Sequence, residues 1–304
     1  MTKTFYSNGK LLLTGEYLVL DGAKALAIPT RFGQSMVIET IAENNIYWQS
    51  KNDKDTIWFK AVLNIKNFES SKKLKSNNEI TNKLFKILSS AKKLNPNFLS
   101  TENGFKITTE LDFPRDWGLG SSSTLINNIA QWAQVDAHLL LQESFRGSGY
   151  DIACAQNNNP ILFQLQNSTP KIEPIKLDWD FTNVLFFVYL NKKQDSKKGI
   201  QLYRNASFSK VEAVSQISKF TDSLLLSDSV SAFENTIEKH EAYISKILKL
   251  QTVKELHFSD YQGAIKSLGA WGGDFILATG DKSNWEYFRK KGYKTIIAFD
   301  DMIL

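Results

Sequence analysis

The pattern of hydrophobic and polar positions along the chain predicts a mixture of strands and helices. In the first forty residues, short runs rich in Leu and Val are punctuated by glycines and by the Asp21-Gly22 pair, which is typical of strands joined by tight turns. Residues 46–63 form a further aromatic and β-branched segment that a polar turn divides. The apolar period then changes, which predicts a helix over 79–94 followed by an alternating strand over 104–111.

The middle of the chain predicts one long helix and a pair of strands. Apolar positions after residue 120 fall on a single helical face, and they predict one helix that runs to about residue 142. Residues 161–166 and 183–190 are rich in β-branched and aromatic side chains, so they predict two paired strands. A linker that contains Pro170 and Pro174 separates them.

The last hundred residues begin with helices and end in short alternating elements. Two amphipathic helices are predicted within residues 209–250. The order expected after them is a helix at 259–268, a glycine turn, a strand at 275–279, a helix at 284–292 and a strand at 294–299. A change of composition near residue 170 predicts two domains, 1–170 and 171–304, both of α+β character.

Composition excludes several classes of function. The 304 residues include one cysteine and three scattered histidines, so an internal disulfide, redox chemistry and a zinc site are not expected. The formal charge of +5 comes from lysines spread along the chain, which argues against nucleic acid as a partner. No apolar run is long enough to cross a membrane, and the first residues lack the apolar region of a secretory signal. We therefore expect a soluble cytoplasmic protein with no membrane partner.

The stretch Gly118–Thr124 carries the strongest chemical signal. Gly118 and Gly120 are followed by four hydroxyl residues at the start of the predicted helix. Backbone N–H groups at a helix start are unpaired and favour negative charge, and glycines let the chain approach a bulky anion. A phosphate-binding loop is the functional interpretation, and a helix capped by Ser121 or Ser122 is the structural one. Neither the Walker A order nor the G-x-G-x-x-G fingerprint is met, since Ser123 stands at the third glycine position.

Three other segments are candidates for chemistry. Asp151 follows two glycines in a small, apolar run, where it could accept a proton from a substrate hydroxyl or simply bond to its own backbone as a turn residue. Lys10 lies beside Gly9, before an apolar strand, and could neutralise charge on a transferred phosphoryl group, although lone lysines are usually solvated. The glycine cluster in 268–274 fits either a ligand loop or a helix cap.

The order and spacing of these segments resemble the motif series of the GHMP kinases. The segments are GKLLLTGEYLVLDGAKALAIP, PRDWGLGSSS, GSGYDIACA and KSLGAWGGD, and together they span residues 9 to about 280. The resemblance implies a two-domain α+β fold: an N-terminal ATP-binding domain like ribosomal protein S5 domain 2, a ferredoxin-like C-terminal domain, and an active site between them. Within the superfamily, the motifs are most similar to those of phosphomevalonate kinases and, after them, mevalonate kinases.

The resemblance also implies roles for individual residues. It assigns ATP binding to Gly118, Leu119, Gly120, Ser121, Ser122 and Ser123, and Mg²⁺ binding to Ser122 and Glu143. Asp151 matches the family's proposed base for the acceptor hydroxyl, and Lys10 matches the lysine that lies near it. Acceptor binding is assigned to Glu16, Gly149, Gly269, Gly272 and Gly273.

Two motifs depart from the family pattern. Arg115, Asp116 and Trp117 stand before Gly118 where the family usually has small residues, and Trp117 could pack on the nucleotide or close the loop. In the family's order of motifs, residues 9–29 match the first motif, residues 114–123 the second and residues 266–274 the third. Leu268 and Trp271 are likewise bulky for the third motif.

The resemblance implies ATP-dependent phosphorylation of a small alcohol or of an already phosphorylated acceptor. Phosphomevalonate or mevalonate, in isoprenoid precursor synthesis, is the first expectation. A diphosphomevalonate decarboxylase and a catalytically silent nucleotide-binding member are the alternatives. Whether the chain forms a homodimer is not readable from these residues.

Overall fold

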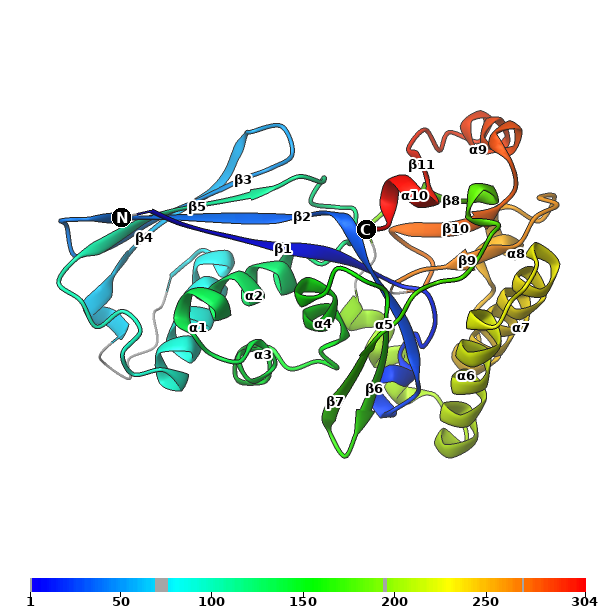
Figure 1. The fold of residues 1–304 in the computed structure, drawn as a ribbon, viewed down its shortest axis with the longest axis horizontal. Coiled ribbons are helices and arrows are strands. Elements are labelled where there is room, and N and C mark those ends of the chain that lie inside the picture. Colours follow the sequence, from blue (N-terminus) through cyan, green and yellow to red (C-terminus); the bar gives the residue numbers. More distant parts are fainter. Residues whose placement is uncertain (1, 69–75, 194–195, 270) are drawn as a thin grey trace. The chain divides into compact units, whose positions relative to one another are not determined.

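The computed structural model describes residues 2–68, 76–193, 196–269 and 271–304 (Figure 1). Two compact units are present. Unit 1 comprises Met1–Gly9, Phe32–Arg115 and Gly120–Gln156, and unit 2 comprises Lys10–Arg31, Asp116–Leu119 and Asn157–Leu304. The predicted boundary near residue 170 stays a prediction. No helix in the described part of the chain is long and apolar enough to span a membrane.

Unit 1 has a sheet with helices packed on one face (Figure 1). Its strands have the order β4-β3-β5-β2, and β1 also pairs with β2. The bounds are β1 Thr2–Leu12, β2 Ala25–Ile41, β3 Asn45–Lys51, β4 Ile57–Asn64 and β5 Gly104–Leu111. β2 and β5 are antiparallel, from Gln34 opposite Leu111 to Ile41 opposite Gly104, whereas β3 and β5 are parallel. β1 and β2 contribute residues to both units.

The helices of unit 1 supply the other half of its core. They are α1 Glu79–Leu94, α2 Ser121–Ala133, α3 Ala137–Ser144 and α4 Tyr150–Gln156, with a 3₁₀ helix at Ile65–Phe68. Ile38 and Ile107 of the sheet are buried in one cluster with Leu88 of α1 and Ile129 of α2. The apolar period that predicted a helix over 79–94 is therefore confirmed, as are the strands on both sides of the polar turn within 46–63.

The single helix predicted to run to residue 142 is wrong, because the chain breaks after Ala133. Gln134 adopts a left-handed conformation (φ 54°) and ends α2. Asp136 then caps α3 by accepting a hydrogen bond from the backbone N–H of Leu139 at 2.8 Å. Two helices with separate caps share one apolar periodicity, so the periodicity alone does not reveal the break.

Unit 2 contains a small antiparallel sheet in the order β11-β8-β10-β9. The bounds are β8 Leu185–Tyr189, β9 Ile265–Ser267, β10 Phe275–Thr279 and β11 Ile296–Ala298. Its helices are α5 Ser196–Asn205, α6 Lys210–Leu225, α7 Val230–Leu248, α8 Val253–His257, α9 Trp285–Lys290 and α10 Phe299–Met302, with 3₁₀ helices at Leu18–Asp21, Thr182–Val184 and Lys282–Asn284. The predicted strand at 275–279 is confirmed with the same bounds, and the predicted helices within 209–250, the helix at 284–292 and the strand at 294–299 are confirmed with shifted ends.

The predicted pairing of 161–166 with 183–190 is wrong. β6 (Ile161–Gln166) instead forms a hairpin with β7 (Thr169–Pro174), and it also pairs with residues 25–27 of β2. The hairpin turns at two residues of positive φ, 50° and 65°, which match the right-handed twist of the strands. β7 is an edge strand, where Pro170 and Pro174 are tolerated because no second neighbour needs their missing N–H groups.

Two further predictions are corrected in unit 2. Residues 18–21 form a 3₁₀ helix instead of a strand. Residues 259–268 do not form a helix, since they bend through a glycine and then enter β9. A side chain at Gly263 would bring its Cβ to 2.2 Å from the Thr279 carbonyl oxygen, so this glycine permits the close approach of the segment to β10.

Candidate active site

In unit 2, the lysine of the first motif binds the loop of the second. Lys10 is the tenth residue of the chain and lies in β1. Its ammonium donates to the Gly118 carbonyl oxygen at 2.8 Å, and its backbone N–H donates to the Leu119 carbonyl oxygen at 3.0 Å. The side chain of Leu119 is fully buried, so any contact of this residue with a ligand would have to come from its backbone.

The second and third motifs meet at a carboxylate that the sequence interpretation did not assign. Gly118 has φ 68°, and a Cβ on it would lie 2.1 Å from Oδ2 of Asp274. A Cβ on Gly269 would lie 3.6 Å from the same oxygen. Unit 2 therefore brings Lys10, Gly118 and Asp274 together. The Gly-Gly-Asp ending of the third motif was the signal that could have identified Asp274.

Two of the three unusual residues before Gly118, Asp116 and Trp117, have partners in the small sheet. The Tyr189 hydroxyl donates to Oδ2 of Asp116 at 2.8 Å, and burial together with this bond raises the pKa of Tyr189. The Trp117 ring packs edge-on against Phe275, with centroids 5.3 Å apart. The sequence allowed two roles for Trp117: closing the loop and packing on the nucleotide. These contacts favour the first.

The remaining glycines of the third motif shape a strained loop. Gly269 and Gly272 have φ 67° and 84°, and Trp271 and Asp274 also have positive φ, 39° and 52°. A backbone in which side-chain-bearing residues adopt left-handed conformations persists only where its surroundings hold it. The acceptor-binding role of Gly269, Gly272 and Gly273 stays a prediction.

In unit 1, the start of α2 presents part of the predicted hydroxyl cradle. Gly120 caps the helix with φ 90° and no side-chain hydrogen bond. Ser122 is exposed and Ser121 is half-buried, whereas Ser123 is buried and donates to the Gly120 carbonyl oxygen at 2.7 Å. Thr124 is also buried and donates to Oε1 of Gln34 at 2.9 Å. Two of the four hydroxyls therefore serve the fold, and two can meet an anion together with the first-turn N–H groups.

Asp151 lies at the start of α4, next to a histidine that the sequence did not single out. Its side chain is half-buried, and Oδ1 accepts a hydrogen bond from the Ile152 backbone N–H at 3.0 Å. A Cβ on Gly149 would lie 2.7 Å from Nδ1 of His138. Both ring nitrogens of His138 are buried without a hydrogen-bond partner among the described residues. Burial lowers the pKa of His138, against the opposing effects of Asp136 and Asp151.

The predicted Mg²⁺ ligand Glu143 is engaged at the surface. Its carboxylate pairs with the Lys93 ammonium at 2.8 Å, and 41% of its side chain is exposed. Its metal role stays a prediction, as does that of Ser122.

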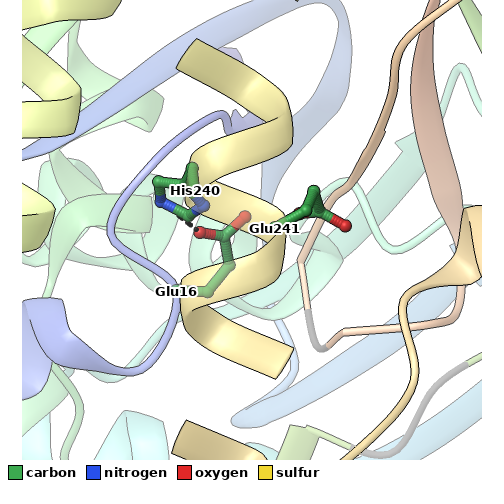
Figure 2. A group of neighbouring side chains, drawn as sticks. All are labelled: Glu16, His240 and Glu241. Atoms are coloured by element: carbon green, nitrogen blue, oxygen red, sulfur yellow. Dashed lines mark ion pairs between the residues drawn. The ribbon is translucent and has the colours of Figure 1, made fainter. Parts of the chain in front are cut away.

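The predicted acceptor residue Glu16 lies inside unit 2. Its carboxylate is fully buried and pairs with Lys266 of β9, which lies opposite Leu277 of β10. His240 of α7 points toward Glu16 (Figure 2), and a carboxylate oxygen of the neighbouring Glu241 lies within 4.8 Å of ligand atoms of both. Burial raises the pKa of Glu16 to about 7, against the lowering effect of Lys266. Its acceptor-binding role stays a prediction, and no sequence signal indicated the three partners.

Comparison with known proteins finds similar folds and no similar sequences. No family model and no curated protein sequence matches the chain. A mevalonate kinase from Methanococcus jannaschii has TM-score 0.71 at 16% identity, over 98% of this chain and 97% of that one. A galactokinase from Lactococcus lactis, complexed with galactose, has TM-score 0.72 at 13% identity, over 100% and 93%. A phosphomevalonate kinase from Streptococcus pneumoniae, in complex with phosphomevalonate and AMPPNP, has TM-score 0.69 at 16% identity, over 97% and 99%.

A decarboxylase also has this fold. A mevalonate diphosphate decarboxylase from Legionella pneumophila has TM-score 0.61 at 13% identity, over 98% of this chain and 100% of that one. At these identities the comparisons establish the fold, and the reaction and acceptor must be argued from the chain's own residues.

Proposed function

Because the chain has the fold of the GHMP kinases, we propose that it transfers a phosphoryl group from ATP to a small-molecule acceptor. The observation that carries this proposal is the start of α2. A glycine-capped first turn there leaves Ser122 exposed and Ser121 half-buried, directly after the loop whose Gly118 carbonyl binds Lys10. Unpaired N–H groups and free hydroxyls at a helix start are suited to a polyanion.

ATP would be held by the first-turn N–H groups of α2 and by the hydroxyls of Ser121 and Ser122. Mg²⁺, bound with the nucleotide and aided by Ser122, would supply neutralisation of the phosphate charge. Phosphoryl transfer asks little covalent chemistry of a protein, so positioning and charge neutralisation do most of the catalysis. Lys10 would offset the charge that develops on the transferred group.

Asp151 would accept the proton of the acceptor hydroxyl. Its half-buried carboxylate lies at the start of α4 beside the neutral His138, where it could meet a substrate hydroxyl.

We expect Asp151→Asn to fold and bind nucleotide normally but to turn over about a hundredfold more slowly, the low end of general-base effects. ADP release under saturating ATP and acceptor measures this. Unchanged turnover in the variant would remove Asp151 from the mechanism.

The first proposed substrate is a phosphorylated acceptor, phosphomevalonate, and the second is mevalonate, which carries no phosphate. Lys192 and Lys193 are exposed before α5, and Lys197 and Lys198 are exposed in its first turn. Cationic side chains near a helix start can bind a phosphate group. These lysines belong to the sequence segment KKQDSKKG, residues 192–199, whose Gln194 and Asp195 lie outside the described residues.

Each of two alternative functions has a specific observation in its favour. The fold is shared with a decarboxylase, which would release carbon dioxide together with ADP and phosphate. A silent nucleotide-binding protein is suggested by the bulky Trp117 and Trp271, and it would produce no ADP. An ADP-release assay with mevalonate, phosphomevalonate, diphosphomevalonate and a sugar panel separates the three functions. The proposal predicts acceptor-dependent ADP without carbon dioxide, and ADP with none of these acceptors would contradict it.

A further inference from the structure

The buried charge cluster of unit 2 consists of Glu16, His240, Glu241 and Lys266. These side chains are at most 4% exposed. They come from three places in the chain: the segment after β1, helix α7 and strand β9 (Figure 2). Nε2 of His240 lies 3.3 Å from Oε2 of Glu16, and the Lys266 ammonium lies 2.9 Å from Oε1 of Glu241 and contacts Oε1 of Glu16.

Ligand atoms of Glu16, His240 and Glu241 lie within 4.8 Å of one another, a spacing that could hold a metal ion. The Lys266 ammonium already occupies this place. It donates to Oε1 of Glu16 and to the Ser267 carbonyl oxygen at 2.6 Å, and it forms an ion pair with Oε1 of Glu241 at 2.9 Å. The cation of this cluster is therefore a side chain of the protein.

The charges in the cluster balance only if it holds one proton. Two carboxylates face one ammonium, and Glu16 has a raised pKa because it is buried. Burial, with Lys266 nearby, holds the pKa of His240 well below its usual value, so the imidazole is neutral. A proton on Oε2 of Glu16 would face Nε2 of His240 at 3.3 Å, where the Gly15 backbone N–H also donates at 3.4 Å. Glu241 accepts a hydrogen bond from the Ser267 hydroxyl at 2.7 Å.

Lys266 lies two residues before the third-motif loop, whose described residues are 268–269 and 271–274. β9 has three residues and is an edge strand with one neighbour, β10. Beyond it, the loop has left-handed residues and ends at Asp274, whose carboxylate stands against Gly118. A short edge strand gives such a loop little support, whereas a buried ammonium held by two carboxylates can fix its first residue.

We propose that Lys266 is a positioning residue: its ammonium, held by Glu16 and Glu241, fixes the third-motif loop against the Trp117-Gly118 turn. The consequence for catalysis rests on the proposed kinase function, whereas the consequence for loop order does not. Because the loop borders the turn that binds Lys10, a loosened loop weakens nucleotide binding more than it slows the chemical step.

Hydrogen exchange of Lys266→Met and of the charge-free variant E16Q/K266M/E241Q tests this proposal. The charge-free variant leaves no unpaired buried charge and retains the cluster's volume, so it is expected to fold even where the single variant does not. We expect amides of residues 268–275 to exchange at least about tenfold faster than in the wild-type protein, with residues 79–94 unchanged. Lys254→Met is the matched control, because its lysine pairs with Glu238 at 3.2 Å on the same unit's surface and should change neither segment.

The proposal is overturned if the loop exchanges at the wild-type rate in the charge-free variant, or if that variant fails to fold. If the chain is an active kinase, these Lys266 variants should have a KM for ATP about tenfold above that of the wild-type protein, while their kcat changes less. A wild-type protein that releases no ADP with any acceptor would end the proposed function, and the exchange result would still decide the role of Lys266.

Discussion

At the scale of single residues, the candidate site depends on positions where only a small residue fits. Gly118 combines a left-handed backbone with a carboxylate, that of Asp274, in the space a side chain would need. Gly292 also has a left-handed backbone, φ 92°, but apart from its two chain neighbours no described residue has an atom within 4 Å of a Cβ placed there. Comparing substitutions at these two glycines therefore separates the free-energy cost of the left-handed conformation from that of the steric clash.

Gly118→Ala should destabilise the protein by about 2–3 kcal/mol, because it adds displacement of Asp274 to the conformational penalty. Gly292→Ala should cost about 1 kcal/mol from the conformation alone. Urea denaturation of the two variants measures the difference. Equal destabilisation would show that Asp274 does not hold the loop turn in place.

At the scale of elements, the charge cluster joins the segment after β1, α7 and β9, and its charges balance when it holds one added proton. Glu16 is the group that carries this proton, and Lys266, Glu241 and His240 are the titratable groups that face it, with Tyr17 next to it in the chain. The raised pKa of Glu16 means that the folded chain binds a proton that the unfolded chain has already released.

The stability supplied by Glu16 should therefore be complete below its unfolded pKa and decline as the pH rises toward 7. The decline has a slope of at most about 1.4 kcal/mol per pH unit. Glu16→Gln mimics the protonated form and should lose this dependence. Denaturation of both proteins between pH 5 and 8 tests it, since the wild-type protein should lose stability relative to the variant as the pH rises. A difference that does not change with pH would place the proton elsewhere.

Local sequence patterns predicted the helices and strands better than they predicted which strands pair with one another. The period of 79–94 was sufficient for α1, because one helical face of that segment packs on the sheet. The prolines of 170–174 hid the two-residue turn that pairs β6 with β7. Strand β9 forms because it pairs with β10, and Gly263 permits the close approach of the preceding segment to β10. Likewise the motifs located Lys10, Gly118 and Asp151, whereas Asp274, His138 and Lys266 became visible only through contacts distant in sequence.

At the scale of the whole molecule, nucleotide binding should be measurable as stability. A ligand that binds only the folded state at one hundred times its Kd stabilises it by about 2.7 kcal/mol. Mg²⁺ with AMPPNP should therefore raise the unfolding temperature of the chain. Ser122→Ala should need more nucleotide for the same rise while leaving the free protein unchanged, because Ser122 is exposed.

Ser123→Ala is the matched comparison for that experiment. Its hydroxyl is buried and bonds to the Gly120 carbonyl oxygen, so its loss should lower the stability of the free protein by about 1 kcal/mol. If AMPPNP stabilised Ser122→Ala and the wild-type protein equally at every concentration, the phosphate chain would not meet this hydroxyl.

The most direct test of the central claim is a ³¹P NMR spectrum of the protein incubated with Mg²⁺, ATP and phosphomevalonate, followed by mevalonate. The account predicts that the γ-phosphorus signal of ATP disappears as ADP forms and that a new phosphorus signal arises on the acceptor, without free phosphate. An unchanged ATP spectrum with both acceptors, or ADP accompanied only by free phosphate, would contradict phosphoryl transfer by this chain.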